Sequence, residues 1–295
     1  MAREAGRARA LVIAIDWGTT SFRAYRLDSA GAIVATRSAP KGILSVPAGG
    51  FAAVLDEEIR PWKEERPIVM SGMVGSRQGW VEAPYVPCPA GFPEIAAAMR
   101  EVRKGTWVVP GVSCRDDCGV PDVMRGEETQ VLGAERDGLF CLPGTHSKWV
   151  EVRAGRIARF STAMTGEVYA VLKSHSILGR MMEEGKANAR AFRDGVERSG
   201  EPGGLLHHLF GVRTKGLMGE LDAAAASSYL SGLLIGHEIR SVRPPSFLLL
   251  GEPSLAELYG EAAAALGCET ERLDATSGTR ALFRLGVMLR GKEES

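Results

Sequence analysis

The stretch Leu11–Asp28, LVIAIDWGTTSFRAYRLD, decides the fold of this chain. Its apolar run from Leu11 to Ile15 predicts a buried strand, and Phe22 to Leu27 predicts a second strand. Between the two strands lie an acid, Asp16, an aromatic residue, a glycine and three hydroxyl residues. A plain hairpin does not need that chemistry, so the turn itself indicates a functional role.

The turn has the composition of an anion site. Consecutive backbone N–H groups in a glycine-hydroxyl turn converge on a concavity that attracts anions, and the hydroxyl groups add donors. Asp16 ends an apolar strand, where an unpaired carboxylate is costly unless it meets a cation or solvent. A magnesium ion carried by a nucleotide would supply that cation. We therefore expect Asp16 to bind metal and the turn to bind phosphate through Gly18, Thr19, Thr20 and Ser21.

The same turn recurs in the stretch Leu139–Tyr169. Gly18-Thr19-Thr20-Ser21 aligns with Gly144-Thr145-His146-Ser147, at an offset of 126 residues (144 − 18). Each copy continues as strand, turn and strand, then reaches a glycine, Gly42 or Gly166, and a helical pattern, over Phe51–Trp62 or Glu167–Leu178. The repeat predicts two similar α/β domains that face each other.

In the second copy, His146 and Lys148 add donor or positive character, and Leu142 occupies the position of Asp16. We expect this copy to grip the nucleotide from the opposite side through Gly144, Thr145, His146 and Lys148. The chain contains no G-x-x-x-x-G-K-[ST] loop and no G-x-G-x-x-G after the first strand. Both common nucleotide-binding folds are therefore disfavoured.

Composition narrows the class of partner. Thirty-six basic residues balance thirty-six acidic ones, so a nucleic-acid footprint or a polybasic membrane surface is not expected. Neither a secretory signal nor a window of about 18 consecutive apolar residues is present. The five cysteines are scattered, which fits reduced thiols in a cytoplasm. We expect small-molecule partners and allow for a homodimer.

Several motifs together resemble the 2-dehydro-3-deoxygalactonokinase (2-keto-3-deoxygalactonate kinase) family of the actin and hexokinase superfamily, over nearly the whole chain. They are AIDWGTT (Ala14–Thr20), VMSGMVGS (Val69–Ser76), VMRGEETQ (Val123–Gln130), PGTHSKWV (Pro143–Val150), MTGE (Met164–Glu167), SGLLIGHE (Ser231–Glu238) and LLLGEPSLAELY (Leu248–Tyr259).

The resemblance implies two ribonuclease-H-like, actin/hexokinase-type α/β domains around a nucleotide cleft. We expect residues 1–134 to form an ATPase domain with the sugar-acid-binding loops, and residues 135–275 to form a nucleotide-binding domain. A helix over about 276–295 would pack back on the first. The implied reaction transfers the γ-phosphoryl group of Mg-ATP to the 6-hydroxyl of 2-dehydro-3-deoxy-D-galactonate. Gly251 and Ser254, in a strand-to-helix loop, would lie against the adenosine.

Phosphoryl transfer needs a group that accepts the hydroxyl proton. Glu127 and Glu128 open a predicted helix after Gly126, and the helix dipole would favour an ionised carboxylate there. By analogy with the exopolyphosphatase branch of the superfamily, one of the two is the catalytic acid, and the sequence does not choose between them. Asp116 and Asp117 are the fallback bases.

A keto-acid carboxylate favours an arginine fork and N–H donors. The candidates lie in the loop after a short strand and before the Glu127–Glu128 pair: Ser71, Gly72, Met73, Gly75, Ser76, Arg77 and Arg125.

Three alternatives stay open on the sequence alone. The substrate could be another sugar acid or sugar, because epimers differ by one hydroxyl group. The protein could be an exopolyphosphatase-like phosphohydrolase, although the extra helical domain of such enzymes is missing. It could also be a non-catalytic nucleotide switch, which would not need the glycine-rich loops between Ser71 and Ser113.

Overall fold

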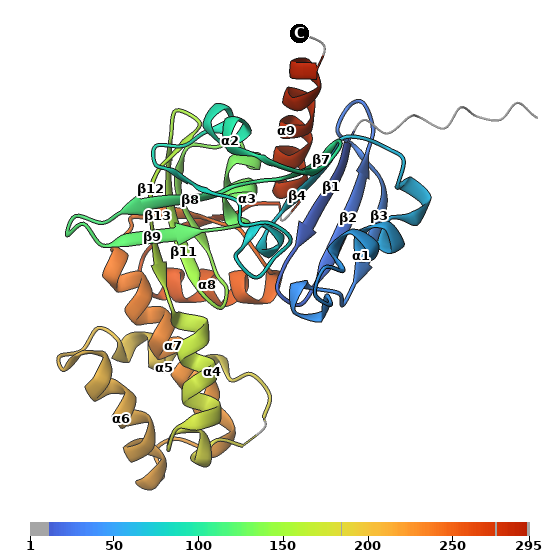
Figure 1. Ribbon diagram of the computed structural model, residues 1–295. Coiled ribbons are helices and arrows are strands. Elements are labelled where there is room, and N and C mark those ends of the chain that lie inside the picture. Colours follow the sequence, from blue (N-terminus) through green and yellow to red (C-terminus); the bar gives the residue numbers. More distant parts are fainter. Residues whose placement is uncertain (1–11, 184, 275, 294–295) are drawn as a thin grey trace, which may run out of the picture. The chain divides into compact units, whose positions relative to one another are not determined.

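The computed structural model describes residues 12–183, 185–274 and 276–293 (Figure 1). Leu11 of the opening strand and the last two residues of the expected C-terminal helix lie outside the described residues. The chain divides into two compact units. The first comprises the described residues up to 137, residues 151–160 and the chain from 274 onward; the second comprises residues 138–150 and 161–273.

The first unit is built on a six-stranded sheet with the order β3-β2-β1-β4-β7-β6. Its strands are β1 (Val12–Trp17), β2 (Phe22–Leu27), β3 (Ile33–Ala39), β4 (Ile68–Ser71), β6 (Arg100–Arg103) and β7 (Thr106–Val108). β1 pairs antiparallel with β2 and parallel with β4. A smaller sheet is formed by β5 (Tyr85–Pro87), β8 (Gly111–Arg115) and β9 (Pro121–Met124).

Helices of the first unit are α1 (Phe51–Glu58), α2 (Phe92–Ala98), α3 (Glu127–Gly133) and α9 (Ser277–Glu293). α9 packs against β1 and β4 (Figure 1). Phe51–Trp62, predicted as one helix, is α1 followed by a 3-10 turn at Arg60–Trp62. Pro61 explains the break, because proline has no N–H for a continuing helix and its ring clashes with the preceding turn.

The core of the first unit forms where the apolar face of β1 meets α1. Ile13, Ile15 and Trp17 are fully buried there with Leu55. The ring of Trp17 meets Phe22 edge to face, with 5.0 Å between ring centroids. Trp17 therefore packs in the core behind the first turn, as an aromatic residue at a strand end does when it carries a large apolar surface.

The second unit repeats the plan of the first. Its five-stranded sheet has the order β12-β11-β10-β13-β14, and of β11 and β12 only the residues outside 151–160 belong to the second unit. The strands are β10 (Gly138–Leu142), β11 (Ser147–Arg153), β12 (Arg156–Ala163), β13 (Ser246–Leu249) and β14 (Glu269–Arg272). In the first sheet, β1, β2 and β3 lie side by side in chain order, and β4 pairs with the other side of β1. In the second sheet, β10, β11 and β12 have the same arrangement, and β13 pairs with the other side of β10. The repeat predicted from the sequence is thus confirmed in the fold.

Helices of the second unit are α4 (Thr165–His175), α5 (Ala189–Arg198), α6 (Gly204–Leu217), α7 (Ala223–Val242) and α8 (Pro253–Ala265). α5 packs along α7 (Figure 1). A Cβ on Gly232 would lie 1.9 Å from the backbone oxygen of Phe192, and one on Gly236 would lie 2.4 Å from Ser199 Oγ. The two glycines therefore let α7 pack closely against α5.

Candidate active site

The first turn is held by its own backbone and by a glycine that follows β3. Gly18 N donates to Ser21 O at 2.9 Å, and Ile43 N donates to Gly18 O at 3.0 Å. A Cβ on Gly42 would lie 2.2 Å from Thr19 O, closer than any side chain tolerates. Thr19 and Thr20 remain exposed. The turn is therefore fixed by its neighbours and presents its hydroxyl groups outward.

The second turn is held in the same way inside the second unit. Glu167 N donates to Thr145 O at 2.9 Å, and a Cβ on Gly166 would lie 2.3 Å from Gly144 O. Thr145 and His146 are exposed, and the His146 ring pairs with the Glu167 carboxylate. Gly42 and Gly166, which the sequence repeat aligns, thus each allow the backbone to pack closely against the turn of their own copy.

Lys148 lies in β11 rather than on the exposed face of the turn. Its side chain is buried, and its Nζ donates to Thr162 Oγ1 at 2.7 Å. Its predicted contact with the nucleotide stays a prediction.

Asp16 leaves the sheet beside Ser71, its register partner on β4. The Asp16 side chain is 41% exposed, and its Oδ2 lies 3.4 Å from Arg23 Nη1. Protein atoms packed around the carboxylate raise its pKa by desolvation, while Arg23 lowers it. Asp16 is therefore a partly exposed carboxylate near the carboxyl end of β1, and Arg23 is a distant cationic partner.

Glu128 lies beneath the same edge of the sheet. Its side chain is 1% exposed, Oε2 accepts from Gly126 N at 2.6 Å, and Oε1 lies 3.5 Å from Ser71 Oγ. Burial, with a smaller contribution from Glu127, raises the pKa of Glu128 to about 8. The expectation that the helix dipole keeps this carboxylate ionised is therefore wrong, because desolvation outweighs the dipole and the backbone hydrogen bonds.

The other predicted bases have different surroundings. Glu127 is only half-buried, and its Oε2 accepts from Arg125 N at 3.1 Å. Asp116 accepts from Cys118 N and Val120 N at 2.9 and 2.8 Å, as a turn residue does. Glu128 is the predicted base that combines burial with a raised pKa.

Arg125 lies against the loop that follows β4. Its Nη2 donates to Ala83 O at 2.8 Å, and its guanidinium group lies 4.4 Å from the ring centre of Tyr85. A Cβ on Gly75 would meet Arg125 Nη1 at 2.9 Å. Within the described part of the chain, Arg125 Nε, Arg125 Nη1 and Ser76 Oγ are buried without a hydrogen-bond partner. Such orphaned donors require a partner, because burying them unpaired is costly.

The remaining members of the predicted substrate loop differ in exposure. Ser71 is 2% exposed, Gly72 adopts φ 97°, and Met73 packs against the core. Arg77 is 86% exposed and its Nη2 lies 3.4 Å from Glu82. Its contact with substrate stays a prediction.

The strand-to-helix loop before α8 begins at Gly251, which adopts φ 146°. The cap of α8 is Glu252, whose Oε2 accepts from Ser254 N and Leu255 N, each at 3.1 Å. Glu252, and not Ser254, therefore caps the helix, and the Ser254 hydroxyl donates to the Glu252 carboxylate.

Comparison with known proteins identifies the family. The family model described as "2-keto-3-deoxy-galactonokinase" matches residues 16–285. The chain is 38% identical over 284 residues to the 2-dehydro-3-deoxygalactonokinase of Escherichia coli (strain K12), covering 93% of this chain and 95% of the relative. The chain belongs to the 2-keto-3-deoxy-galactonokinase family.

Solved structures agree with this membership. A crystal structure of a candidate 2-dehydro-3-deoxygalactonokinase from Sinorhizobium meliloti is 36% identical, with a TM-score of 0.87 over 95% of this chain and 99% of that one. The Clostridium difficile activator of 2-hydroxyisocaproyl-CoA dehydratase, solved with bound ADPNP, is 11% identical, with a TM-score of 0.51 over 96% and 97%. The actin/hexokinase-type α/β fold predicted for this galactonokinase family member is thereby confirmed.

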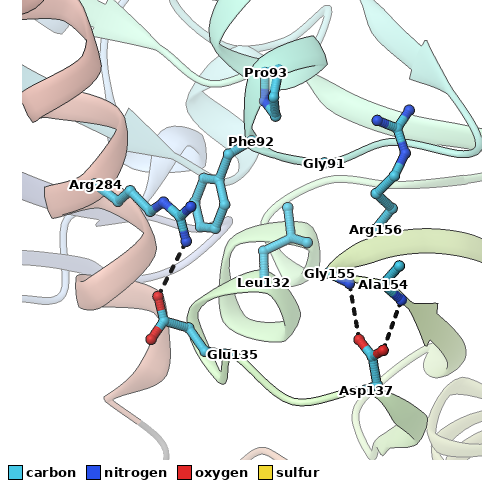
Figure 2. A pocket seen from close by; sticks show the side chains of 10 residues that line it. All are labelled: Gly91, Phe92, Pro93, Leu132, Glu135, Asp137, Ala154, Gly155, Arg156 and Arg284. Atoms are coloured by element: carbon cyan, nitrogen blue, oxygen red, sulfur yellow. Dashed lines mark hydrogen bonds and ion pairs between the residues drawn. The ribbon is translucent and has the colours of Figure 1, made fainter.

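A cavity of about 470 Å³ in the first unit of this galactonokinase family member lies apart from the predicted site residues (Figure 2). On one side Arg284 covers the ring of Phe92 and pairs with Glu135 at 3.2 Å. On the other side Asp137 accepts from the backbone N–H groups of residues 154 and 155. Arg284 and Glu135 thus pair with each other, Asp137 is satisfied by backbone N–H groups, and none of the residues predicted for the site lines the cavity.

Among the described residues of the kinase family member, no group of three or more His, Cys, Asp or Glu side chains could hold a metal ion by itself. Nor does any described helix have the length and apolar character to span a membrane.

Proposed function

We propose that the protein transfers the γ-phosphoryl group of ATP to the 6-hydroxyl group of 2-dehydro-3-deoxy-D-galactonate, giving the 6-phosphate and ADP. The named Escherichia coli relative and the family match support this substrate. The observation that carries the proposal is that one unit holds both the buried unpartnered donors of Arg125 and Ser76 and the Asp16 and Glu128 carboxylates, which are linked through Ser71.

The donors suit a sugar-acid carboxylate. A guanidinium group offers N–H donors to a carboxylate, and here Nε and Nη1 of Arg125 lack partners among the described residues. Ser76 Oγ adds a hydroxyl donor of the same kind. A guanidinium group binds phosphate oxygens as well as carboxylates, so it is the family match that favours the kinase over the phosphohydrolase.

Glu128 is the proton acceptor in this proposal. A general base works best when its pKa lies near the operating pH, and burial brings the pKa of Glu128 to about 8. Its carboxylate follows Arg125 by three residues and contacts Gly126 N, so a substrate held by Arg125 would lie beside it. Its role is to take the proton of the 6-hydroxyl group as the oxygen attacks phosphorus.

Asp16 would hold the divalent cation, Mg²⁺. Its single carboxylate fits this ion, because Mg²⁺ is usually bound through one or two carboxylates together with substrate phosphates and water. When bound, the ion neutralises charge on the β- and γ-phosphates. The hydroxyl and N–H groups of the turns at Gly18–Ser21 and Gly144–Ser147 would hold the phosphates.

A coupled ADP-release assay tests the proposal, with Mg-ATP against a panel of 2-keto-3-deoxy sugar acids and with water alone. Turnover should require the sugar acid and should be fastest with the galactonate compound. Glu128→Gln should lower kcat at least about 100-fold, whereas Glu127→Gln should lower it less than about tenfold. ADP release at the same rate with every sugar acid and with water would overturn the proposal.

A further inference from the structure

A buried carboxylate of the second unit, at the end of the SGLLIGHE motif, is not among the predicted site residues. Glu238, near the end of α7, is 5% exposed. Trp149 Nε1 on β11 donates to its Oε1 at 2.8 Å, and the Tyr259 hydroxyl group on α8 donates to its Oε2 at 2.6 Å. Glu238 therefore ties three elements of the unit together at one point.

The contacts continue to the second phosphate turn. Ser147 Oγ, fully buried at the end of that turn, lies 2.8 Å from Tyr259 Oη. Tyr259 donates its single hydroxyl proton to Glu238, so it can only accept from Ser147, whose own proton can go to Tyr259 or directly to Glu238. Because an ionised carboxylate can only accept hydrogen bonds, Glu238 fixes which way these hydroxyl groups donate.

A second connection reaches the segment that backs the turn. Thr165, the first residue of α4, also hydrogen-bonds to Glu238. The next residue, Gly166, packs against Gly144 and Thr145 of the turn. Both segments that shape the turn are therefore anchored to one side chain.

Burying this carboxylate costs free energy that an apolar side chain would not cost. Burial raises the pKa of Glu238, and the hydrogen bonds from its four partners lower it. α7 itself is fixed, because Gly232 and Gly236 bring it into backbone contact with α5. Glu238 is thus held on a fixed helix, is hydrogen-bonded through both carboxylate oxygens, and is connected to the Gly144–Ser147 turn.

We propose that Glu238 is a positioning residue, which holds the Gly144–Ser147 turn in the conformation that receives the phosphates of ATP. The inference rests on the proposed function, because it takes this turn as a nucleotide site. Glu238 acts through Tyr259 and Ser147 and does not touch the reacting atoms.

Two variants break the chain without removing bulk. In Glu238→Gln the amide NH₂ must face one of two donors; if it faces Tyr259, that hydroxyl group must turn toward Ser147 and reverse the chain. Tyr259→Phe removes the hydroxyl group that joins Ser147 to Glu238 and keeps the Trp149 bond. Phe247→Leu is the matched control, because Phe247 packs on Trp149 in the same core, with 4.9 Å between ring centroids, and takes no part in the chain.

Steady-state kinetics with each substrate varied separately, together with thermal unfolding, give the test. Both chain variants should raise the KM for ATP or lower kcat by about tenfold or more, with the KM for the sugar acid within about twofold of wild type. Phe247→Leu should lower Tm while keeping both KM values. Unchanged ATP kinetics in both chain variants, or the same changes in Phe247→Leu, would overturn the inference.

Binding of ADP, measured by calorimetry, separates this inference from the proposed function. If the wild-type protein phosphorylates none of the sugar acids, the proposed function fails. The inference then stands if Tyr259→Phe and Glu238→Gln bind ADP about tenfold more weakly than wild type and Phe247→Leu does not. Equal ADP binding by all four proteins would sink it.

Discussion

Asp16 and Ser71 pair directly across the parallel strands β1 and β4, and the Ser71 hydroxyl group lies 3.5 Å from Glu128 Oε1. The two carboxylates proposed to react therefore both lie near the carboxyl ends of β1 and β4. Loops at the carboxyl ends of parallel strands are where α/β sheets bind ligands. The order of the strands, more than any single motif, brings these groups together.

Removing the charge of Asp16 should weaken metal use. Asp16→Asn keeps the shape of the side chain and loses the anionic ligand, so kcat should fall at least about 100-fold, and half-maximal activity should need more Mg²⁺. Titration of activity with MgCl₂ at saturating ATP measures both effects. A variant with the metal dependence of wild type would show that Asp16 is not a ligand.

The pH dependence of the reaction should report Glu128. A base must be unprotonated to act, so with a pKa of about 8 the value of kcat/KM should rise with pH up to about 8 and then level. Glu127→Gln should keep this profile. A profile that is flat between about pH 7 and 9 would argue against Glu128 as the base.

The same pKa has a consequence for stability. In the unfolded chain Glu128 titrates at its ordinary value of 4.5, and in the folded protein at about 8. The folded state therefore binds more protons between these values, and this residue's contribution to the free energy of unfolding is lost as pH rises from 4.5 to about 8. Glu128→Gln removes this titrating group, so the free energy of unfolding of the variant, measured with urea, should fall less between pH 4.5 and about 8. An unchanged pH slope would contradict the raised pKa.

Arg125 should control affinity for the sugar acid. Arg125→Lys keeps the charge and loses the fork, so the KM for the sugar acid should rise at least about tenfold while the KM for ATP stays within about twofold. Arg153→Lys is a matched control, since Arg153 is 70% exposed and pairs with Glu151. If Arg125→Lys changes the KM for ATP instead, the guanidinium group belongs to the nucleotide site.

The glycines behind the two turns should not tolerate a methyl group. Gly42→Ala places Cβ 2.2 Å from Thr19 O, and the overpacking should cost about 3 kcal/mol of unfolding free energy together with most of the activity. Gly211→Ala in α6 is the contrast, because nothing lies within 4 Å of its Cβ; there alanine should stabilise by about 0.5–1 kcal/mol. Chemical denaturation of both variants checks the pair. Equal stability of the two would refute the steric argument.

The sequence predicted those parts of the structure that depend on local chemistry and on repetition. Gly42 and Gly166 stand out in the repeat, and each proves to pack against the turn of its own copy. The helix predicted to begin at Glu127 is also confirmed. It could be predicted because acidic residues in the first turn interact favourably with the helix dipole.

What the sequence did not show are contacts between residues far apart in the chain. Glu238, Tyr259 and Ser147 meet across 21 and 112 residues, and no local pattern links them. The ionisation of Glu128 was misjudged for a related reason. The helix dipole can be read from the sequence, but the depth of burial depends on how β4 and its loops pack around the carboxylate.

The most direct test of the central claim is the position of the new phosphate. The purified protein would be incubated with Mg-ATP and 2-dehydro-3-deoxy-D-galactonate, and the product examined by phosphorus–proton correlation NMR. We expect a single phosphomonoester coupled to the two C6 protons, formed in equal amount with ADP and absent when the sugar acid is omitted. Inorganic phosphate as the only new phosphorus species, or a phosphate on another carbon, would contradict it.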